Sequence, residues 1–474
     1  MSVEQSDGPI RSDLEVAAEA SEVFEWNRSV SAGRTGAGGS DGRAVEDASE
    51  LVRDRPGSRP GNGLWVDATH GPSIAGAVDS TGPTVTDVTA DARSDDIVPF
   101  RIEVPEEQLD DLVEWIRRAR WPEQETVEGS DEPWSQGMPL RVAQQLALHW
   151  SSGYDLRRVQ DRLNSWPQFR TVVDDLAVHF LHVRSPEPDA LPLVITHGWP
   201  GSVVEFLKVI GPLTDPAAHG GDPSDAFHVV APSLPGFGWS DKPERPGWGV
   251  PRIAAAWEQL MLRLRYDRFG AQGGDWGSMV TMAMAIHHPT HLAGIHVNMP
   301  IVIPASPPEE MTPAEASAAA SLEHYMTWDS GYSSQQSTRP QTLAYGLADS
   351  PVGQMAWIVE KFWSWTDCDG DPLNALTADE LLDNVMVYWL TNSAASSARL
   401  YWESFKDVDF SPIGVPSGIS VFPHEIFRTS RRWAEGRFTD LRHFNEVDRG
   451  GHFAAFEQPE LFVDELRSAF REMR

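Results

Sequence analysis

The stretch AQGGDWGSMV, residues 271–280, decides which fold this chain adopts. It lies between an apolar run and a helical pattern, and its glycines permit a sharp turn from a strand into a helix. The spacing is that of a G-x-S-x-G turn, which exposes a nucleophile at the end of a strand. Asp275 occupies the serine position. The sequence therefore predicts a strand–turn–helix unit that exposes a carboxylate. An ordinary glycine-rich turn with a capping aspartate is the structural alternative.

Apolar segments typical of strands precede and follow this turn. They span residues 176–185, 191–198, 226–236, 268–275, 292–298 and 419–423. Continuous apolar runs indicate strands that are buried on both faces, and helical patterns lie between them. This alternation predicts a mostly parallel, doubly wound α/β sheet. Sheets of this class bind ligands at the carboxyl ends of their strands.

Composition and periodicity divide the chain into five regions. Residues 1–96 are rich in acids and glycines and have little periodicity, which predicts a disordered acidic extension. Residues 97–172 form a mainly helical N-terminal region, and 173–301 and 406–474 form two parts of an α/β core. The strand rhythm stops between residues 302 and 405, where the sequence is helical and aromatic. We expect this insertion to form a cap over the carboxyl edge of the sheet.

The charge and cysteine content exclude several classes of function. The net charge of the 474 residues is −32, so nucleic acid and anionic membranes would be repelled. We find neither an apolar stretch long enough to span a membrane nor a signal peptide. One cysteine, Cys368, excludes an internal disulfide and a cysteine-based metal site. We therefore expect a cytoplasmic protein without a membrane anchor, and a homodimer is compatible with the sequence.

A second motif, HGWPGS, follows the apolar segment LPLVIT. A turn of glycine, an aromatic residue and proline exposes backbone N–H groups at the same edge of the sheet. The N–H groups of Trp199 and Trp276 would then form an oxyanion hole. The substrate-facing positions of the turn are His197, Gly198 and Pro200. The X–Pro bond before Pro200 permits a cis peptide in this turn. An ordinary tight turn is the structural alternative.

A third motif, RGGHFAAFEQPE, places a histidine near the C-terminus. His452 follows two glycines, which is where α/β-hydrolases carry their base, in the chain order nucleophile, acid, histidine. The acid must lie between Asp275 and His452 and near the end of a strand. Glu425 follows the segment ISVFP and satisfies this condition, while Asp409 and Asp448 remain alternatives on these grounds.

Taken together, these motifs resemble the microsomal, or juvenile-hormone, branch of the epoxide hydrolases. The resemblance covers residues 97 to 474. The motifs that carry it are HGWPGS (197–202), GFGWSDKP (236–243), GGDWGS (273–278), DSPVGQMAWIVEKFWSWTD (349–367), RGGHFAAFEQPE (449–460) and two N-terminal segments, PFRIEVPEEQLDDL (99–112) and DLRRVQDRLNSWPQFRT (155–171). Membrane-bound enzymes of this branch begin with an apolar anchor, whereas this chain has the acidic extension.

The resemblance implies roles for particular residues. The charge-relay glutamate of the family falls in an FP-x-E turn, which implies Glu425. Two cap tyrosines that donate to the epoxide oxygen correspond to Tyr332, in DSGYSSQ, and Tyr401, in SSARLYWES. For three other cap tyrosines we expect a role in core packing: Tyr325, Tyr345 and Tyr388.

An aspartate suits this chemistry because an epoxide carbon is attacked by displacement. A carboxylate is ionised at neutral pH and needs no base to activate it. Ring opening gives an alkoxide that tyrosine protonates, and His452 then activates water to hydrolyse the ester of Asp275. The partners expected are a small hydrophobic epoxide and water, with no metal and no organic cofactor. Ser278 lies a turn into the predicted helix and is not expected to be the nucleophile.

Two other functions are compatible with parts of this pattern. A haloalkane dehalogenase uses the same aspartate, histidine and acid, but a halide leaving group requires N–H donors where an epoxide oxygen requires tyrosine. A non-catalytic sensor of small molecules on a hydrolase scaffold is disfavoured because the nucleophile, base and acid positions are complete.

Overall fold

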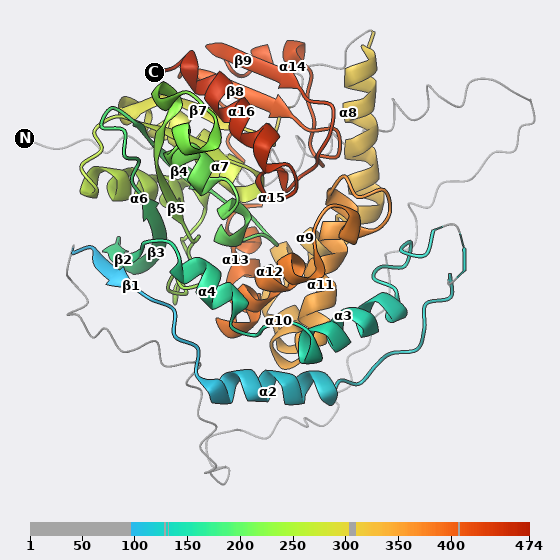
Figure 1. Cartoon of the computed structure of the whole chain (residues 1–474). Coiled ribbons are helices and arrows are strands. Elements are labelled where there is room, and N and C mark those ends of the chain that lie inside the picture. Colours follow the sequence, from blue (N-terminus) through green and yellow to red (C-terminus); the bar gives the residue numbers. More distant parts are fainter. Residues whose placement is uncertain (1–95, 128, 131, 303–309, 406–407) are drawn as a thin grey trace, which may run out of the picture. The chain divides into compact units, whose positions relative to one another are not determined.

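The computed structural model describes residues 96–474 except 128, 131, 303–309 and 406–407. The expected disorder of residues 1–96 therefore falls, apart from residue 96, outside the described residues. The sheet, the helices around it and the cap all belong to the described part of the chain (Figure 1).

The centre of the fold is a nine-stranded sheet with the order β1-β2-β3-β5-β4-β6-β7-β8-β9. Pairing is antiparallel from β1 to β5 and parallel from β5 through β4 to β9. The strands are β1 (Val98–Phe100), β2 (Gln168–Val173), β3 (Leu176–Val183), β4 (Leu191–Thr196), β5 (Phe227–Pro232), β6 (Phe269–Gly273), β7 (Leu292–Val297), β8 (Ser417–Val421) and β9 (Leu441–Glu446). The prediction of a mostly parallel sheet is confirmed.

All six predicted strands are present: β3 to β7 lie within the expected segments, and β8 begins two residues before the segment expected at 419–423. Their central residues are buried, as continuous apolar runs require. β9 is different, because its sequence LRHFNE leaves it half-exposed at the edge of the sheet. The N-terminal region contributes β1 and β2 as well as helices, and its helical pattern did not indicate β2.

The helices outside the cap lie between β1 and β2, between later strands of the core, and after β9. They are α2 (Glu106–Arg117), α3 (Leu140–Ser152), α4 (Arg158–Asn164), α5 (Ile210–Thr214), α6 (Val250–Arg263), α7 (Asp275–His287), α14 (Arg431–Glu435), α15 (Ala454–Glu457) and α16 (Pro459–Arg471). Short 3₁₀ turns are η1 (Val203–Phe206), η2 (Ala217–His219), η3 (Pro223–Asp225), η4 (Pro289–His291) and η6 (Pro372–Asn374). α7 is buried on every side, because its run of methionine, alanine and valine has no polar face.

The segment between β7 and β8 forms the cap, and its described residues are helical. Its elements are α8 (Pro313–His324), a π-helix η5 (Tyr325–Asp329), α9 (Gly331–Thr338), α10 (Pro340–Asp349), α11 (Pro351–Trp365), α12 (Ala378–Leu390) and α13 (Ala394–Ser404). Hydrogen bonds from Asn384 Nδ2 to Pro200 O (2.7 Å) and from Tyr388 Oη to Gly201 O (2.7 Å) fix α12 to the HGWPGS turn. The cap therefore contacts the carboxyl edge of the sheet directly.

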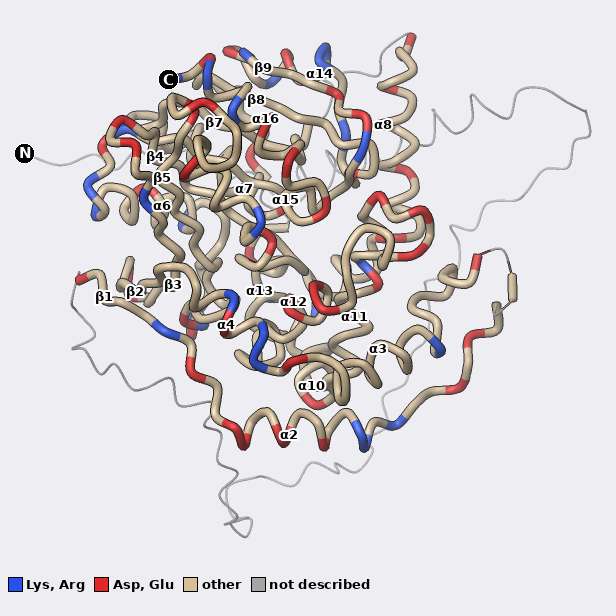
Figure 2. Tube along the Cα trace, in the orientation of Figure 1, with Lys and Arg blue, Asp and Glu red and all other residues tan. Residues whose placement is uncertain are grey.

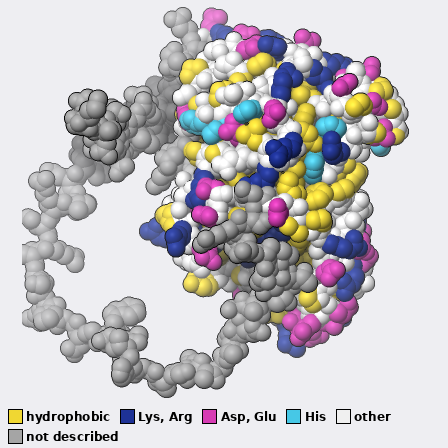
Figure 3. All heavy atoms as spheres, turned by 90° about the vertical axis from the view of Figure 1, so that its left-hand side faces the viewer, with side chains coloured by type: hydrophobic (Ala, Val, Ile, Leu, Met, Phe, Trp, Pro, Cys, Tyr) yellow, Lys and Arg dark blue, Asp and Glu magenta, His cyan; other side chains and the backbone are white. Residues whose placement is uncertain are grey.

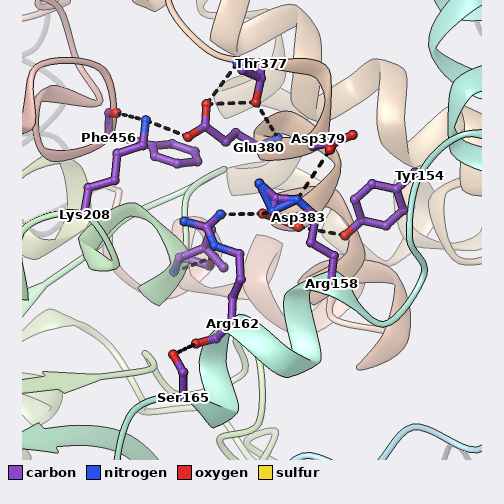
Figure 4. A network of polar contacts seen from close by, with 12 residues as sticks. Tyr154, Arg158, Arg162, Ser165, Lys208, Thr377, Asp379, Glu380, Asp383 and Phe456 are labelled. Carbon is purple, nitrogen blue, oxygen red and sulfur yellow. Dashed lines mark hydrogen bonds and ion pairs between the residues drawn. The ribbon is translucent and has the colours of Figure 1, made fainter.

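A network of polar contacts joins the N-terminal helices to the cap (Figure 4). The carboxylate of Asp383 on α12 is buried and accepts hydrogen bonds from Tyr154 Oη (2.8 Å), Arg158 Nη1 (3.2 Å) and Arg162 Nη1 (2.6 Å). Burial raises the pKa of Asp383 although all three partners oppose that shift. The network fixes α4 against α12, so the N-terminal region and the cap pack as one structure.

Charged side chains of both signs are spread over the described part of the chain. Figure 2 shows acidic and basic residues scattered along the trace, with several acidic residues in succession along α2. On the face shown in Figure 3 they are interspersed with apolar side chains. None of the described helices is both long enough and apolar enough to cross a bilayer.

Candidate active site

The predicted turn between β6 and α7 carries Asp275 at its tip, where the residue is 8% exposed. Its φ angle is +50°, a left-handed conformation that non-glycine residues rarely adopt. The turn requires its glycines because the backbones approach closely. A Cβ on Gly273 would lie 2.0 Å from Gly277 O, and one on Gly277 would lie 1.9 Å from Thr196 O. These contacts hold the first residue of α7 at the carboxyl end of the sheet.

The HGWPGS turn lies against this aspartate. The backbone N–H of Trp199 donates to Asp275 Oδ1 at 2.7 Å, and the Trp199–Pro200 bond is cis. A Cβ on Gly198 would lie 2.0 Å from Asp275 Oδ1, so only glycine permits this approach. Trp276 follows Asp275 in the first turn of α7, where N–H groups lack intrahelical partners. The N–H of Trp199 therefore contacts the carboxylate, and the N–H of Trp276 belongs to the residue next to Asp275 in the chain.

His197 supports the turn from behind. Its Nδ1–H donates to Gly198 O at 2.9 Å, and its Nε2 accepts from Leu234 N at 3.2 Å. Burial lowers the pKa of His197 to about 4, which keeps the imidazole neutral. Ser278 makes no approach to the exposed face, since its buried Oγ donates to Met299 O at 2.6 Å.

The histidine and glutamate motifs meet at the same edge. His452 Nε2 lies 3.4 Å from Asp275 Oδ2, and its Nδ1–H donates to Glu425 Oε1 at 2.7 Å. The backbone N–H of His452 donates to Trp365 O on α11 at 2.8 Å, which ties the loop to the cap. The alternative acids lie elsewhere: Asp409 pairs with His287, and Asp448 is exposed beside Arg449.

The charge state of His452 follows from these neighbours. Burial opposes the imidazolium, but the charge of Glu425 and the hydrogen bonds to Asp275 and Glu425 outweigh it. The pKa of His452 is therefore raised well above its ordinary value. Conversion of Asp275 to a neutral ester would remove part of this stabilisation and favour the neutral imidazole that can act as a base.

Two cap tyrosines cover the aspartate. The ring of Tyr332 stacks on that of Trp199, with centroids 4.9 Å apart and planes 9° apart. The ring of Tyr401 meets that of Trp276 edge-on, with centroids 4.8 Å apart. Both phenols are buried, and burial raises the pKa of Tyr332 and of Tyr401 well above the usual value. The two hydroxyl groups are therefore neutral, and the charge of Asp275 contributes to both shifts.

The remaining cap tyrosines differ from one another. Tyr388 is buried and packs on Phe237, as expected. Tyr345 was expected in the core, but 69% of its surface is exposed, because it lies on the outer face of the amphipathic helix α10. Tyr325 is buried, and its hydroxyl lies 3.3 Å from that of Tyr332. The two residues belong to consecutive helical segments, Tyr325 to the π-helix η5 and Tyr332 to α9.

The sheet and these contacts define an α/β-hydrolase whose elbow carries an aspartate in place of serine. Residues 97–206 match the family described as epoxide hydrolase N terminus, and residues 192–340 match the alpha/beta hydrolase fold. Among curated proteins, an epoxide hydrolase of Stigmatella aurantiaca described as putative is 54% identical over 380 residues, which are 80% of this chain and 86% of that protein. Epoxide hydrolase 1 of Sus scrofa is 34% identical over 80% of this chain and 89% of its own length.

Solved structures agree with these relatives. The juvenile hormone epoxide hydrolase of the silkworm Bombyx mori superimposes with a TM-score of 0.73 and 31% identity, over 80% of this chain and 95% of that chain. The Aspergillus niger epoxide hydrolase gives 0.72 and 31%, over 80% and 97%. This chain therefore belongs to the epoxide hydrolase family, in the branch that holds epoxide hydrolase 1 and the juvenile hormone epoxide hydrolases.

Proposed function

We propose that this epoxide hydrolase converts a small hydrophobic epoxide to a vicinal diol through a covalent ester of Asp275. In the first step Asp275 Oδ attacks an epoxide carbon, the C–O bond of the ring breaks, and the oxygen leaves as an alkoxide. Tyr332 or Tyr401 donates its proton to that oxygen. The charge of Asp275 contributes to the raised pKa of both phenols. Its loss on ester formation makes each hydroxyl a better acid as the ring opens.

The second step hydrolyses the ester. His452 accepts a proton from water, which attacks the carboxyl carbon of Asp275, and Glu425 stabilises the imidazolium. The tetrahedral intermediate carries an oxyanion for the N–H groups of Trp199 and Trp276. One such donor typically contributes about 2.7–4 kcal/mol, or roughly 10²–10³ in rate. Collapse of the intermediate breaks the ester C–O bond, the leaving oxygen takes the proton of the new carboxyl group, and the diol is released with the carboxylate restored. The proton held by His452 then returns to the tyrosinate left by the first step, which completes the cycle.

One observation carries this proposal more than any other. A single carboxylate, Asp275, accepts the Trp199 N–H at 2.7 Å and lies 3.4 Å from His452 Nε2. The carboxylate at the nucleophile position therefore has an N–H donor for an oxyanion and a base beside it. The two neutral phenols belong to the cap above it. A dehalogenase would share the first three features, but the tyrosine hydroxyls favour an epoxide oxygen over a halide.

The experiment is a single turnover of excess enzyme with styrene oxide in ¹⁸O-labelled water. We expect the first diol to be free of label, because its new oxygen comes from Asp275. Labelled diol in the first turnover would exclude the ester. A chloroalkane serves as the rival substrate, and release of chloride at a comparable rate would favour the dehalogenase.

Substitution of His452 tests whether the ester of Asp275 accumulates. His452→Gln keeps the nucleophile but removes the base, so we expect an adduct on Asp275 with the mass of one styrene oxide. Its absence after single turnover, with binding intact, would exclude His452 as the hydrolytic base.

A cytoplasmic location and a homodimer stay predictions from sequence, and the free, buried Cys368 supports a reducing compartment.

A further inference from the structure

A small cavity lies beside the elbow, and its lining contains none of the described cap residues. Its volume is about 20 Å³. That space is enough for one or two water molecules. Its lining includes polar side chains from η1, the end of β6, the elbow, the residue after β7 and the base: Glu205, Gln272, Asp275, Asn298 and His452.

Glu205 is a carboxyl group that the two-step mechanism does not use. It lies in the 3₁₀ turn η1 and is only 8% exposed. A Cβ on Gly201 would lie 1.5 Å from Glu205 Oε1. Gly201 therefore gives the carboxyl group the space it occupies beside the cavity. Burial raises the pKa of Glu205 to about 8, with His452 opposing the shift and the charge of Asp275 adding to it.

Gln272, which also lines the cavity, has an unpaired buried acceptor. Its Nε2 donates to Asn298 Oδ1 at 3.0 Å, but its buried Oε1 has no hydrogen-bond partner among the described residues. An unpaired buried acceptor costs about 1–3 kcal/mol. A water molecule in this cavity would supply the missing donor, so the cavity has the polar partners that a bound water needs.

We propose that Glu205 orients the water that hydrolyses the Asp275 ester, an inference that rests on the proposed function. The water donates one hydrogen to His452 Nε2 and the other to the carboxyl group of Glu205, which leaves a lone pair directed at the carboxyl carbon of Asp275. His452 takes the proton as the new C–O bond forms. Glu205 accepts a hydrogen bond and keeps its own protonation state throughout the step.

The proposal places Glu205 in the second step only. While Asp275 is a free carboxylate, its charge disfavours ionisation of Glu205. Ester formation removes that charge, so the pKa of Glu205 falls and its carboxyl group becomes a stronger acceptor when water is needed. Attack on the epoxide occurs on the cap side, where Tyr332 and Tyr401 lie, and does not require this group.

The test compares Glu205→Leu with Glu205→Gln in single turnovers with styrene oxide, following the ester by quenched mass spectrometry. Leucine removes the acceptor, so we expect ester decay to slow about tenfold or more, with ester formation within about threefold of the unaltered enzyme. In the steady state kcat and KM should fall together, because ester accumulates. Glutamine keeps a carbonyl acceptor and should restore most of the decay rate.

Glu457→Leu is the matched control. Glu457 is another buried carboxyl group near His452, and burial raises its pKa to about 7, but it does not line the cavity. We expect the ratio of ester decay to ester formation to stay within about twofold in this variant.

Three results would overturn the inference. They are normal ester decay in Glu205→Leu, equal slowing of both steps, and a glutamine variant as slow as the leucine variant. If Glu205→Leu does not fold, Glu205→Ala takes its place in the comparison with Glu205→Gln. The circular dichroism spectrum of Glu205→Ala shows whether that variant is folded. Failure of the proposed function looks different, because no ester would then form in His452→Gln or in the unaltered enzyme.

Discussion

Asp275 has a strained backbone conformation and lies among polar groups of the HGWPGS turn, the base and the cap. Its left-handed conformation costs on the order of 1–3 kcal/mol, which the packing of α7 against β4 and β6 must offset. In return its carboxylate accepts the Trp199 N–H at 2.7 Å and lies 3.4 Å from His452 Nε2, and its charge contributes to the raised pKa of both cap phenols. In the proposed mechanism this one carboxylate acts first as nucleophile and then as the carbonyl group of an ester.

The two cap tyrosines should act in one half-reaction. We expect Tyr332→Phe with Tyr401→Phe to slow ester formation by about 10²-fold or more, because the alkoxide loses its proton donor. Ester hydrolysis should change less than about threefold. Single-turnover rates of both steps measure this effect, and Tyr345→Phe, which removes an exposed hydroxyl, is the control. Unchanged ester formation would remove the pair from the mechanism.

The charge of Asp275 should control the titration of its base. In Asp275→Asn we expect the pKa of His452 to fall, because a charge and a hydrogen bond that raise it are lost. Titration of the imidazole by NMR, with His452 assigned through a His452→Gln spectrum, measures the shift. A pKa that is unchanged or higher would contradict the contact between His452 and Asp275. Diol formation should be absent in this variant.

At the scale of elements, α12 connects three parts of the chain. It bonds to the HGWPGS turn through Asn384 and Tyr388 and to α4 through Asp383. Lys208, which follows η1, pairs with Glu380 of the same helix at 2.7 Å and donates to Phe456 O of α15 at 2.8 Å (Figure 4). The position of the cap over the aspartate therefore depends on side-chain contacts that lie outside the reacting groups.

Loss of Asp383 should destabilise the protein. Asp383→Ala leaves Arg158 and Arg162 without their shared partner, and both side chains are only 27% exposed. We expect the free energy of unfolding to fall by about 2–3 kcal/mol, below the full cost of breaking a buried pair because solvent screens the arginines. Urea unfolding measures it. Glu435→Ala, which breaks an exposed pair with Arg431, should cost less than about 0.5 kcal/mol. Equal losses would contradict the role of the network.

For the whole molecule, buried titratable groups predict how stability depends on pH. Burial lowers the pKa of four histidines to about 3 or 4, so the folded state binds fewer protons than the unfolded state below pH 6.5. These residues are His179, His182, His197 and His296. Burial also raises the pKa of Glu205 to about 8 and of Glu457 to about 7, and the pKa of His452 is raised. At higher pH the folded state therefore binds more protons.

Stability should consequently rise with pH up to about 6.5 and fall between about pH 6.5 and 8. The four histidines contribute stability that is lost as pH falls below their unfolded pKa. Glu205, Glu457 and His452 contribute stability that is lost as pH rises towards their folded pKa values. Urea unfolding at pH 5, 6.5 and 8 tests this, and the alkaline loss should shrink in Glu205→Gln. A stability that continues to rise above pH 6.5 would contradict the assignment.

The local signals in the sequence were strong where backbone geometry limits the residue choice. Gly273 and Gly277 admit no side chain, so the elbow could be recognised from residues 271–280 alone. The apolar runs of β3 to β8 were equally clear because both faces of these strands are buried. β9 and β2 gave weaker signals, since β9 lies at a half-exposed edge and β2 follows a helical pattern directly.

The sequence by itself determined the parallel sheet, the order of nucleophile, acid and base, and the family, because these depend on local patterns and on motif order. It did not choose Glu425 over Asp409 and Asp448 without the resemblance, and it did not single out Glu205 within the apolar turn VVEF. Only the tertiary structure placed Glu425 2.7 Å from His452 and Glu205 beside the cavity. The reason is physical: distances between residues far apart in the chain depend on how the cap and sheet pack, and no local pattern encodes them.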